Sequence, residues 1–254
     1  MNIKIKNLSN KYLERFFLLG DIMKISEHMR KILEMAGIEE PLEEMAYPTN
    51  FNLNEFSQIS TFIGRKKYCD ERLQKIGAGS SRIVYRVDDE KVLKIAKNKK
   101  GLAQNEHEAD WGRNNYEIFA KIYEADTNNY TWIEMELATK AKPTDFKRLV
   151  GISWQELCLT IEYIYDIYKP NKNPYYVKRY DSRLMDEFME KEVYSEKNDF
   201  LYNLYTYMMD YQPMIIGDWT RITNWGIVER NEKELPVIID DGLDELIYKT
   251  YYGW

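Results

Sequence analysis

The spacing of hydrophobic positions changes twice along the chain, which divides it into a helical, a strand-rich and a second helical stretch. Residues 9 to 37 predict two helices, and in the second, apolar residues between Ile22 and Ala36 recur at the i, i+3, i+4 and i+7 spacing of one helix face. That apolar stripe must pack against another part of the protein. After a proline-containing loop, Phe56 to Phe62 predicts a further short helix.

The strand-rich stretch extends from Arg72 to Leu137, and from Pro143 to Tyr211 the apolar spacing is again helical. Strands with one intervening helix, followed by helices, predict two lobes. The expected strands are Leu73–Ile76, Ile83–Val87, Val92–Ala96, Ile118–Tyr123 and Tyr130–Leu137, and the expected helices are Ala103–Asn114, Trp154–Tyr168, Leu184–Val193 and Phe200–Met209.

Composition narrows the class of protein. The 254 residues are 44% hydrophobic, enough to bury one large core or two lobes that share a cleft. Because 36 basic and 42 acidic side chains leave a net charge of -6, counterion release cannot drive strong nonspecific binding to nucleic acid, and no such partner is expected. The only cysteines and histidines, Cys69, Cys158, His28 and His107, are too few for a zinc cluster or a disulfide framework.

Targeting signals are also absent from the pattern. The first residues lack an apolar signal-peptide core, and no stretch approaches the roughly 20 apolar residues that span a bilayer. A soluble, cytoplasmic protein without a membrane partner is therefore expected. Abundant Asn, Lys and Ile, with 21 Tyr residues, are typical of AT-rich bacterial or phage genomes.

A glycine-containing run separates the first two expected strands. It reads Gly77-Ala78-Gly79-Ser80-Ser81-Arg82-Ile83-Val84. Positions without a side chain let the backbone approach phosphate groups closely. The run therefore predicts either a phosphate-binding loop or an ordinary tight hairpin, in which Gly-x-Gly is also common.

Lys94 lies in the third expected strand, seventeen residues after Gly77. Glu106 and Glu108 lie on the helix that follows and are candidates for its acidic partner. Because two positions are about 200° apart around a helix, both cannot face the same cleft, and Glu108 is preferred. The alternative is a solvated strand lysine and a solvated helix face.

Two polar motifs occur late in the chain. The first is Ile215-Ile216-Gly217-Asp218 followed by Asn224-Trp225-Gly226-Ile227, and the second is Val237-Ile238-Ile239-Asp240-Asp241-Gly242. Their carboxylate and amide side chains can accept a proton and supply hard oxygen ligands to a metal ion. Taken singly, these residues also suit caps and hairpin turns.

In their order along the chain, from about Leu73 to Leu243, these elements resemble the protein-kinase-like superfamily. The segment Trp132-Ile133-Glu134-Met135-Glu136-Leu137-Ala138 resembles the strand that enters the family's hinge. The resemblance implies ATP with Mg²⁺ or Mn²⁺. By this resemblance, Asp218 acts on the acceptor hydroxyl, and Lys94, held by Glu108, contacts the α and β phosphates. Asn224 and Asp240 bind the metal. The remaining nucleotide contacts come from Gly77, Gly79, Ser80, Val84, Met135 and the Glu136 backbone.

Several positions depart from the family pattern. Arg82 replaces the third glycine, Ile216-Gly217 replaces the usual His-Arg, and Asp241 replaces Phe. Asn224 lies six residues after Asp218 rather than five. Only twelve residues follow Gly242, so neither an activation segment nor the usual peptide-docking platform is expected, and the N-terminal 70 residues are expected to pack against the lobes.

The sequence thus predicts an α+β, two-lobed protein-kinase-like fold with a five-stranded antiparallel N-lobe sheet, a reduced helical C-lobe and a helical N-terminal extension. The expected domains are the extension at residues 1–68, the N-lobe at 69–138 and the C-lobe at 139–254.

The expected activity is ATP-dependent phosphorylation of a hydroxyl group, with a protein serine or threonine as acceptor. A small-molecule phosphotransferase is the first alternative, suggested by Gly217-Asp218 and by the acidic residues Glu187, Glu190 and Glu192, although a solvated helix face suits those three glutamates better. The second is a pseudokinase that binds a partner. The presence of Lys94, Asp218, Asn224 and Asp240 together argues against it.

Overall fold

The computed structural model describes residues 50–109, 115–168, 178–211, 216–242 and 244–251. The chain divides into two compact units, Met1–Met45 and Ala46–Trp254, and all described residues belong to the second. The two helices expected within residues 9 to 37 lie outside the described residues. The division expected at residues 68 and 138 stays a prediction.

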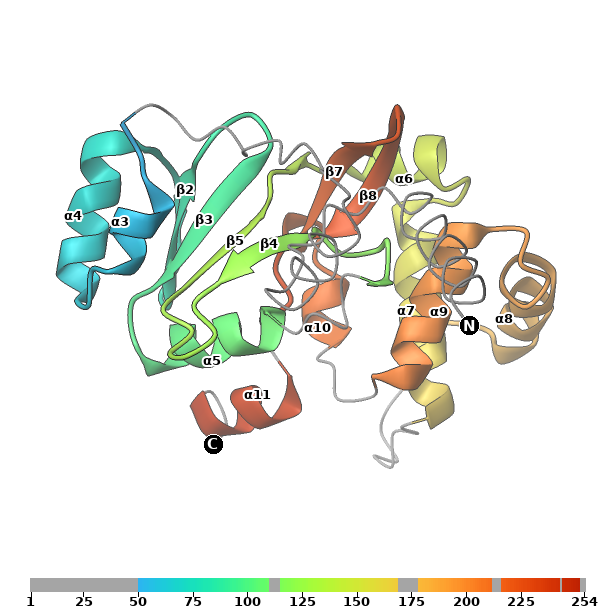
Figure 1. The fold of residues 1–254 in the computed structure, drawn as a ribbon. Helices are drawn as coiled ribbons and strands as arrows, with labels where there is room; N and C mark the ends of the chain where they lie inside the picture. Colours follow the sequence, from blue (N-terminus) through green and yellow to red (C-terminus); the bar gives the residue numbers. More distant parts are fainter. Residues whose placement is uncertain (1–49, 110–114, 169–177, 212–215, 243, 252–254) are drawn as a thin grey trace, which may run out of the picture. The chain divides into compact units, whose positions relative to one another are not determined.

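A five-stranded antiparallel sheet forms the first part of the described unit, in the order β1-β2-β3-β5-β4 (Figure 1). The predicted α+β class and the five strands are confirmed. The strands are β1 Gln74–Ala78, β2 Arg82–Arg86, β3 Lys91–Ala96, β4 Ile122–Ala125 and β5 Trp132–Glu136.

The fourth strand was expected at Ile118–Tyr123 and begins later, at Ile122. The Ile238 amide donates to the Ile118 carbonyl at 2.7 Å, and the Ala120 amide donates to the Ile238 carbonyl at 3.1 Å. Because residues 118–120 satisfy their backbone groups at the end of another strand, β8 (Lys233–Ile238), they do not continue β4. This pairing connects the first sheet to the second.

Alternation along the strands separates the two faces of the first sheet. On one face, Tyr85 and Leu93 pack with residues of helices α3 (Leu53–Ser57) and α4 (Phe62–Arg72) in one apolar cluster. On the other face, the neighbouring Lys94 reaches Glu108 of helix α5 (Lys99–Glu108). Tyr85 and Leu93 thus face an apolar core, whereas Lys94 faces a polar site on the opposite side of the sheet.

The helices flanking this sheet differ from expectation in their bounds, and side-chain caps explain why. The single helix expected at Phe56–Phe62 was wrong, because Asn52 caps α3 and Thr61 caps α4, each by accepting a backbone hydrogen bond. The helix expected from Ala103 begins at Lys99, because Asn98 accepts the Gly101 amide.

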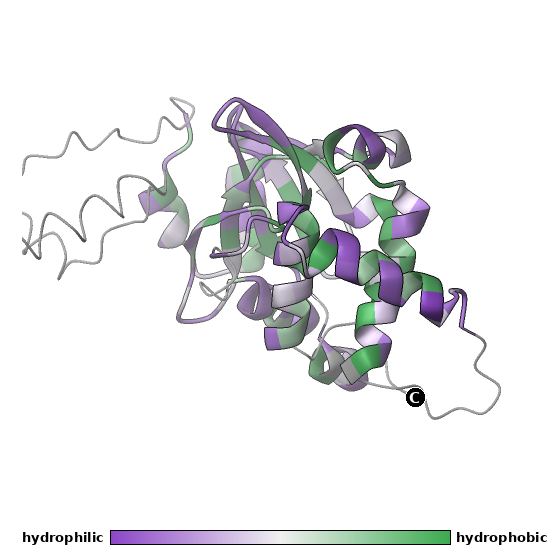
Figure 2. Ribbon diagram, turned by 90° about the vertical axis from the view of Figure 1, so that its right-hand side faces the viewer, coloured by the Kyte–Doolittle hydropathy of each residue, from purple (hydrophilic) through white to green (hydrophobic). Residues whose placement is uncertain are grey.

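The second part of the unit is mainly helical. Helix α7 has its expected bounds, Trp154–Tyr168. The segment expected at Leu184–Val193 forms α8 (Ser182–Phe188) and a π-helical turn, η2 (Met189–Val193). Hydrophobic and hydrophilic residues are interspersed along the helices (Figure 2), and a cluster that includes Trp219 and Trp225 forms the core. The remaining helices are α6 Pro143–Leu149, α9 Asp199–Asp210, α10 Ile216–Trp219, the 3₁₀ turn η3 Ile222–Asn224 and α11 Glu245–Tyr251.

A second sheet was only partly foreseen. Strand β8 contains the expected Val237 and Ile238, but it pairs with β7 (Trp225–Arg230), whose first residues were read from the sequence as part of a loop. The short β6 (Thr139–Lys140) completes the order β6-β7-β8. Among the helices of the described ranges, none combines the length and the apolar character needed to cross a membrane.

Candidate active site

The loop between β1 and β2 is held against the start of helix α5. The Lys97 amide donates to the Ser81 carbonyl at 2.7 Å, the Lys97 ammonium donates to the Gly79 carbonyl at 2.7 Å, and the Asn98 amide group donates to the Ser80 carbonyl at 3.1 Å. An added Cβ at Gly101 would lie 2.3 Å from the Ser81 carbonyl oxygen. Glycine at position 101 is therefore needed for this close approach.

Gly77 and Gly79 have no comparable requirement inside the protein. A Cβ at Gly79 would meet nothing within 4 Å, and one at Gly77 would make only ordinary contact with Val84, at 3.8 Å. Neither glycine has a positive φ. Packing and backbone strain inside the protein therefore do not require glycine at these two positions.

Lys94 is buried and lies at the centre of the polar site. Its ammonium donates to the Glu108 carboxylate at 2.7 Å and to the Ile239 carbonyl at 2.7 Å. Glu106 is exposed, so the structure places Glu108 at Lys94. Burial lowers the pKa of Lys94, against the opposing charge of Glu108. Burial acts to raise the pKa of Glu108, but the charges of Arg82 and Lys94 hold it at about 2.

Arg82 enters the site from β2 and contacts two carboxylates. Its Nη1 lies 2.9 Å from Glu108 Oε1, and its Nη2 lies 2.5 Å from Asp240 Oδ1. The Arg82 side chain is only 7% exposed. Burial acts to lower its pKa, but Glu108 and Asp240 raise it above the ordinary value. The sequence marked Arg82 as a departure from the glycine pattern but gave it no role.

Asp218 lies in the short helix α10 and is buried. Burial raises the pKa of its carboxyl; nearby Arg221 opposes the shift, and Asp240 adds to it. The Arg221 guanidinium lies 3.3 Å from Asp218 Oδ1. Asn224 donates through Nδ2 to the Asp218 carbonyl at 3.1 Å. The 3₁₀ turn η3 ends at Asn224.

Asp240 and Asp241 follow β8 and face different surroundings. The Asp240 side chain is 53% exposed, whereas Asp241 is buried and accepts a 2.7 Å hydrogen bond from the Trp219 indole. The two carboxylates therefore have different partners, Asp240 at the cleft and Asp241 in the core. Neither Trp219 nor Asp241 was a candidate site residue in the sequence.

Glu136, at the end of β5, uses its side chain within the protein. The Arg230 guanidinium donates to both carboxylate oxygens, at 3.1 and 2.5 Å, and the Lys121 amide donates to one of them at 3.0 Å. The Glu136 and Leu137 amides also have partners, the carbonyls of Lys121 and Glu90. Ala138, the residue after Leu137, also lines the cleft.

One cleft of about 380 Å³ brings most of the predicted residues together. Gly77 and Glu108 are not part of its lining, although Glu108 contacts the lining residues Lys94 and Arg82. Arg221 and Thr223, which were not predicted, also line it. The predicted residues in the lining are Gly79, Ser80, Val84, Lys94, Met135, Glu136, Asp218, Asn224 and Asp240.

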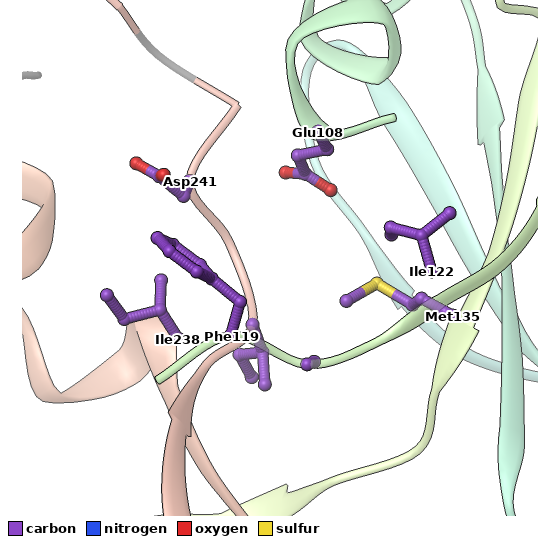
Figure 3. A pocket seen from close by; sticks show the side chains of 8 residues that line it. Glu108, Phe119, Ile122, Met135, Ile238 and Asp241 are labelled. Carbon is purple, nitrogen blue, oxygen red and sulfur yellow. The ribbon is translucent and has the colours of Figure 1, made fainter. Parts of the chain in front are cut away.

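A second cavity of about 20 Å³ shares Met135 and Ile239 with the lining of this cleft (Figure 3). The carboxylates of Glu108 and Asp241 border it, and its other labelled side chains, Phe119, Ile122 and Ile238, are apolar. Its volume suits at most about one water molecule. It therefore cannot serve as a substrate site.

The donor set of the larger cleft suits a metal ion that arrives with a phosphate ligand. Asp240 supplies a carboxylate and Asn224 an amide oxygen, and both line the same space. Mg²⁺ takes hard oxygen ligands and is commonly bound by one or two protein groups together with substrate phosphates. Within the described ranges, no cluster of three or more His, Cys, Asp or Glu could hold a metal ion by itself. The residues present thus fit a nucleotide-bound Mg²⁺ or Mn²⁺.

No family model and no curated protein matches the chain. Among solved structures, it is similar to an APH(2'')-IIIa complex with GDP and kanamycin. The two share 14% sequence identity, the match covers 75% of this chain and 70% of the other, and the TM-score is 0.34. It is also similar to an APH(2'')-IIa complex with streptomycin and ATP, at 12% identity, 73% and 72% coverage and a TM-score of 0.34. A GDP complex of a mutant aminoglycoside 2'-phosphotransferase-IIIa shares 15% identity, with 75% and 69% coverage and a TM-score of 0.35.

Proposed function

We propose that this chain is an ATP-dependent phosphotransferase of the protein-kinase-like superfamily that transfers the γ-phosphoryl group to a hydroxyl. One observation carries the proposal: Lys94, Asp218, Asn224 and Asp240, from separate parts of the chain, line a single cleft of about 380 Å³. A chance arrangement of surface charges has no reason to unite a fixed cation, a buried carboxylate and two oxygen donors.

In this proposal the nucleotide phosphates bind beside the loop between β1 and β2. Lys94 presents a fixed positive charge there, because Glu108 and the Ile239 carbonyl hold its ammonium in place. Gly79 leaves space for close approach of the backbone. Asp240 and Asn224 would hold the metal ion, which neutralises charge on the phosphate oxygens when bound.

Asp218 is the group for the acceptor. Its carboxylate accepts the proton of the acceptor hydroxyl as that oxygen forms a bond to the γ-phosphorus and the bond from the γ-phosphorus to the bridging oxygen of ADP breaks. Burial raises the pKa of Asp218 and so makes it a stronger base than an exposed aspartate. Arg221, 3.3 Å from its carboxylate, stabilises the ionised form in the resting cleft.

The acceptor we propose is a small molecule. The segment after Gly242 turns into α11, which packs against α5, so residues 245–251 do not extend across the helical part as a peptide platform. Glu187 and Glu190 are exposed on α8 and η2 and, like Glu192, do not line the cleft, as their interpretation as a solvated face predicted. A protein serine or threonine acceptor gains no support from the described residues and stays a prediction.

The test is transfer of label from γ-labelled ATP, with Mg²⁺ or Mn²⁺, to a panel of aminoglycosides, amino alcohols and sugars and, separately, to a bacterial lysate. Asp218→Asn should lower turnover by roughly 10²- to 10⁴-fold and leave nucleotide binding nearly unchanged. Asp240→Asn should abolish metal-dependent ATP binding. Glu187→Gln removes a carboxylate outside the cleft and serves as the matched control.

The acceptor that gains label separates the candidate functions. Label in a small molecule that is lost in Asp218→Asn supports the proposal. Label only in proteins assigns the chain to the protein kinases instead. Absence of transfer to any acceptor with either metal overturns the catalytic proposal and leaves a partner-binding pseudokinase.

A further inference from the structure

Arg82 has contacts that the proposed roles of the other residues do not explain. It replaces the third glycine of the kinase-like loop pattern, where a long side chain is not expected. Instead of extending into solvent, the side chain is 7% exposed and lies between helix α5 and the segment after β8. A buried guanidinium is costly unless charged partners and hydrogen bonds compensate it.

The surroundings of Arg82 are built to receive a guanidinium. Glu108 and Asp240 each contact one terminal nitrogen, at 2.9 and 2.5 Å, and Asn105 accepts a long hydrogen bond of 3.5 Å. An added Cβ at Gly242 would lie 3.1 Å from Arg82 Nη2 and 2.8 Å from Gln104 Cβ. The absence of a side chain at position 242 therefore leaves the space that the guanidinium uses.

The contact with Asp240 involves one of its carboxylate oxygens, and within the described ranges the other accepts no hydrogen bond. Arg82 binds Oδ1, yet 53% of the Asp240 side chain is exposed and Asp240 lines the cleft. A carboxylate has lone pairs on both oxygens and can accept from arginine while it binds another group. Guanidinium and metal therefore need not compete for the same oxygen.

We propose that Arg82 is a positioning residue, which holds the Asp240 carboxylate so that its second oxygen faces a nucleotide-bound metal ion. Through its contact with Glu108, Arg82 also links Asp240 to the Lys94–Glu108 pair. The assignment of that ligand rests on the proposed function. Arginine suits this task better than lysine, because its planar guanidinium can donate to Asp240 through one terminal nitrogen while the other pairs with Glu108.

The experiment measures Mn²⁺ binding to the full chain by electron paramagnetic resonance, in the presence of ADP and without any turnover. Arg82→Met should weaken Mn²⁺ binding by about ten- to hundredfold, the range for losing an outer partner of a metal ligand. Arg82→Lys keeps the charge but not the fork and should lie between wild type and Arg82→Met. Arg86→Met is the matched control, because Arg86 lies on the same strand and its guanidinium donates to Asp88 and Asp89, away from the cleft.

Equal or tighter Mn²⁺ binding by Arg82→Met overturns the proposal, since it shows that Arg82 blocks Asp240 or is irrelevant to it. If Arg82→Met does not fold, as judged by its thermal transition, Arg82→Lys decides in the same assay. If the wild-type chain does not bind Mn²⁺ in the presence of ADP, the positioning role is also overturned. Suppose instead that the wild-type chain binds Mn²⁺, that Arg82→Met weakens this binding, and that no acceptor is phosphorylated. That result supports the positioning role of Arg82 and overturns only the proposed catalysis.

Discussion

The indole of Trp219 donates a 2.7 Å hydrogen bond to the carboxylate of Asp241, and both side chains are buried. Trp219 directly follows Asp218, and Asp241 directly follows Asp240. The bond therefore ties the segment that carries the proposed base to the segment that carries the proposed metal ligand. Asp241 departs from the kinase-like sequence pattern, and in the structure it has a polar partner in the core.

Trp219→Phe should destabilise the protein and lower phosphoryl transfer. The substitution keeps an aromatic ring in the core but removes one hydrogen-bond donor to a buried carboxylate, at a cost of about 1–3 kcal/mol. Denaturant unfolding measures the loss of stability, and transfer of labelled phosphate measures the loss of activity.

Asp241→Asn is the companion to this variant, because its amide oxygen still accepts from Trp219. It should retain more stability than Trp219→Phe. If Trp219→Phe unfolds at the same denaturant concentration as wild type and transfers phosphate equally well, the bond does not hold the two segments together.

A pair of glycine variants should separate ligand binding from packing. Gly79→Ala meets nothing within 4 Å and should leave stability unchanged while it weakens nucleotide binding. Gly101→Ala places a Cβ 2.3 Å from the Ser81 carbonyl oxygen and should cost at least the roughly 1–3 kcal/mol typical of overpacking. Thermal unfolding with and without ADP measures both effects. Equal nucleotide affinity in wild type and Gly79→Ala would show that the loop backbone does not approach the phosphates.

Glu108 should make the stability of the protein depend on pH in the acid range. Its pKa is about 2 in the folded protein, below the ordinary 4.5, because Arg82 and Lys94 favour the ionised form over the effect of burial. A lowered pKa contributes stability that is present above 4.5 and is lost as the pH falls towards 2. Glu108→Gln should therefore show a weaker loss of stability over that interval.

At neutral pH the same variant should be less stable than wild type by about 3–5 kcal/mol, because two buried cations lose their shared carboxylate. Denaturant unfolding at several pH values measures both quantities. Glu106→Gln, which changes an exposed carboxylate two positions away, is the control and should behave as wild type. Parallel stability curves for Glu108→Gln and wild type below pH 4.5 would contradict the assigned cause.

Local patterns were sufficient to predict the sheet and the position of Lys94. Strand alternation and the order of the motifs depend on neighbours in sequence, and the structure has all five strands in the first sheet. Helix bounds were less accurate, although Asn52, Thr61 and Asn98 are ordinary capping residues that the sequence displays. Had these capping residues been used to place the starts of the helices, the predicted bounds would have matched the structure better.

The contacts that organise the site were beyond such patterns. Arg82 and Asp240 are 158 positions apart, and no local spacing pairs them. Trp219 and Asp241 are 22 positions apart and belong to different elements. Strand β7 also escaped prediction, because its first residues were assigned to the loop that carries Asn224. Tertiary pairing, rather than local preference, determines all three features.

Asp218 should set the acid limb of the pH profile. As a base it acts only when ionised, so kcat/KM falls as the pH drops through its pKa, which burial raises above the ordinary 3.8. Arg221 favours the ionised form, and Arg221→Met should therefore move the acid limb to higher pH. Arg183→Met removes an exposed arginine that pairs with Glu187 outside the cleft, and its profile should coincide with wild type. Rates of phosphoryl transfer from pH 4 upward at saturating Mg-ATP measure the limb, and a shift to lower pH in Arg221→Met would remove Asp218 from the role of base.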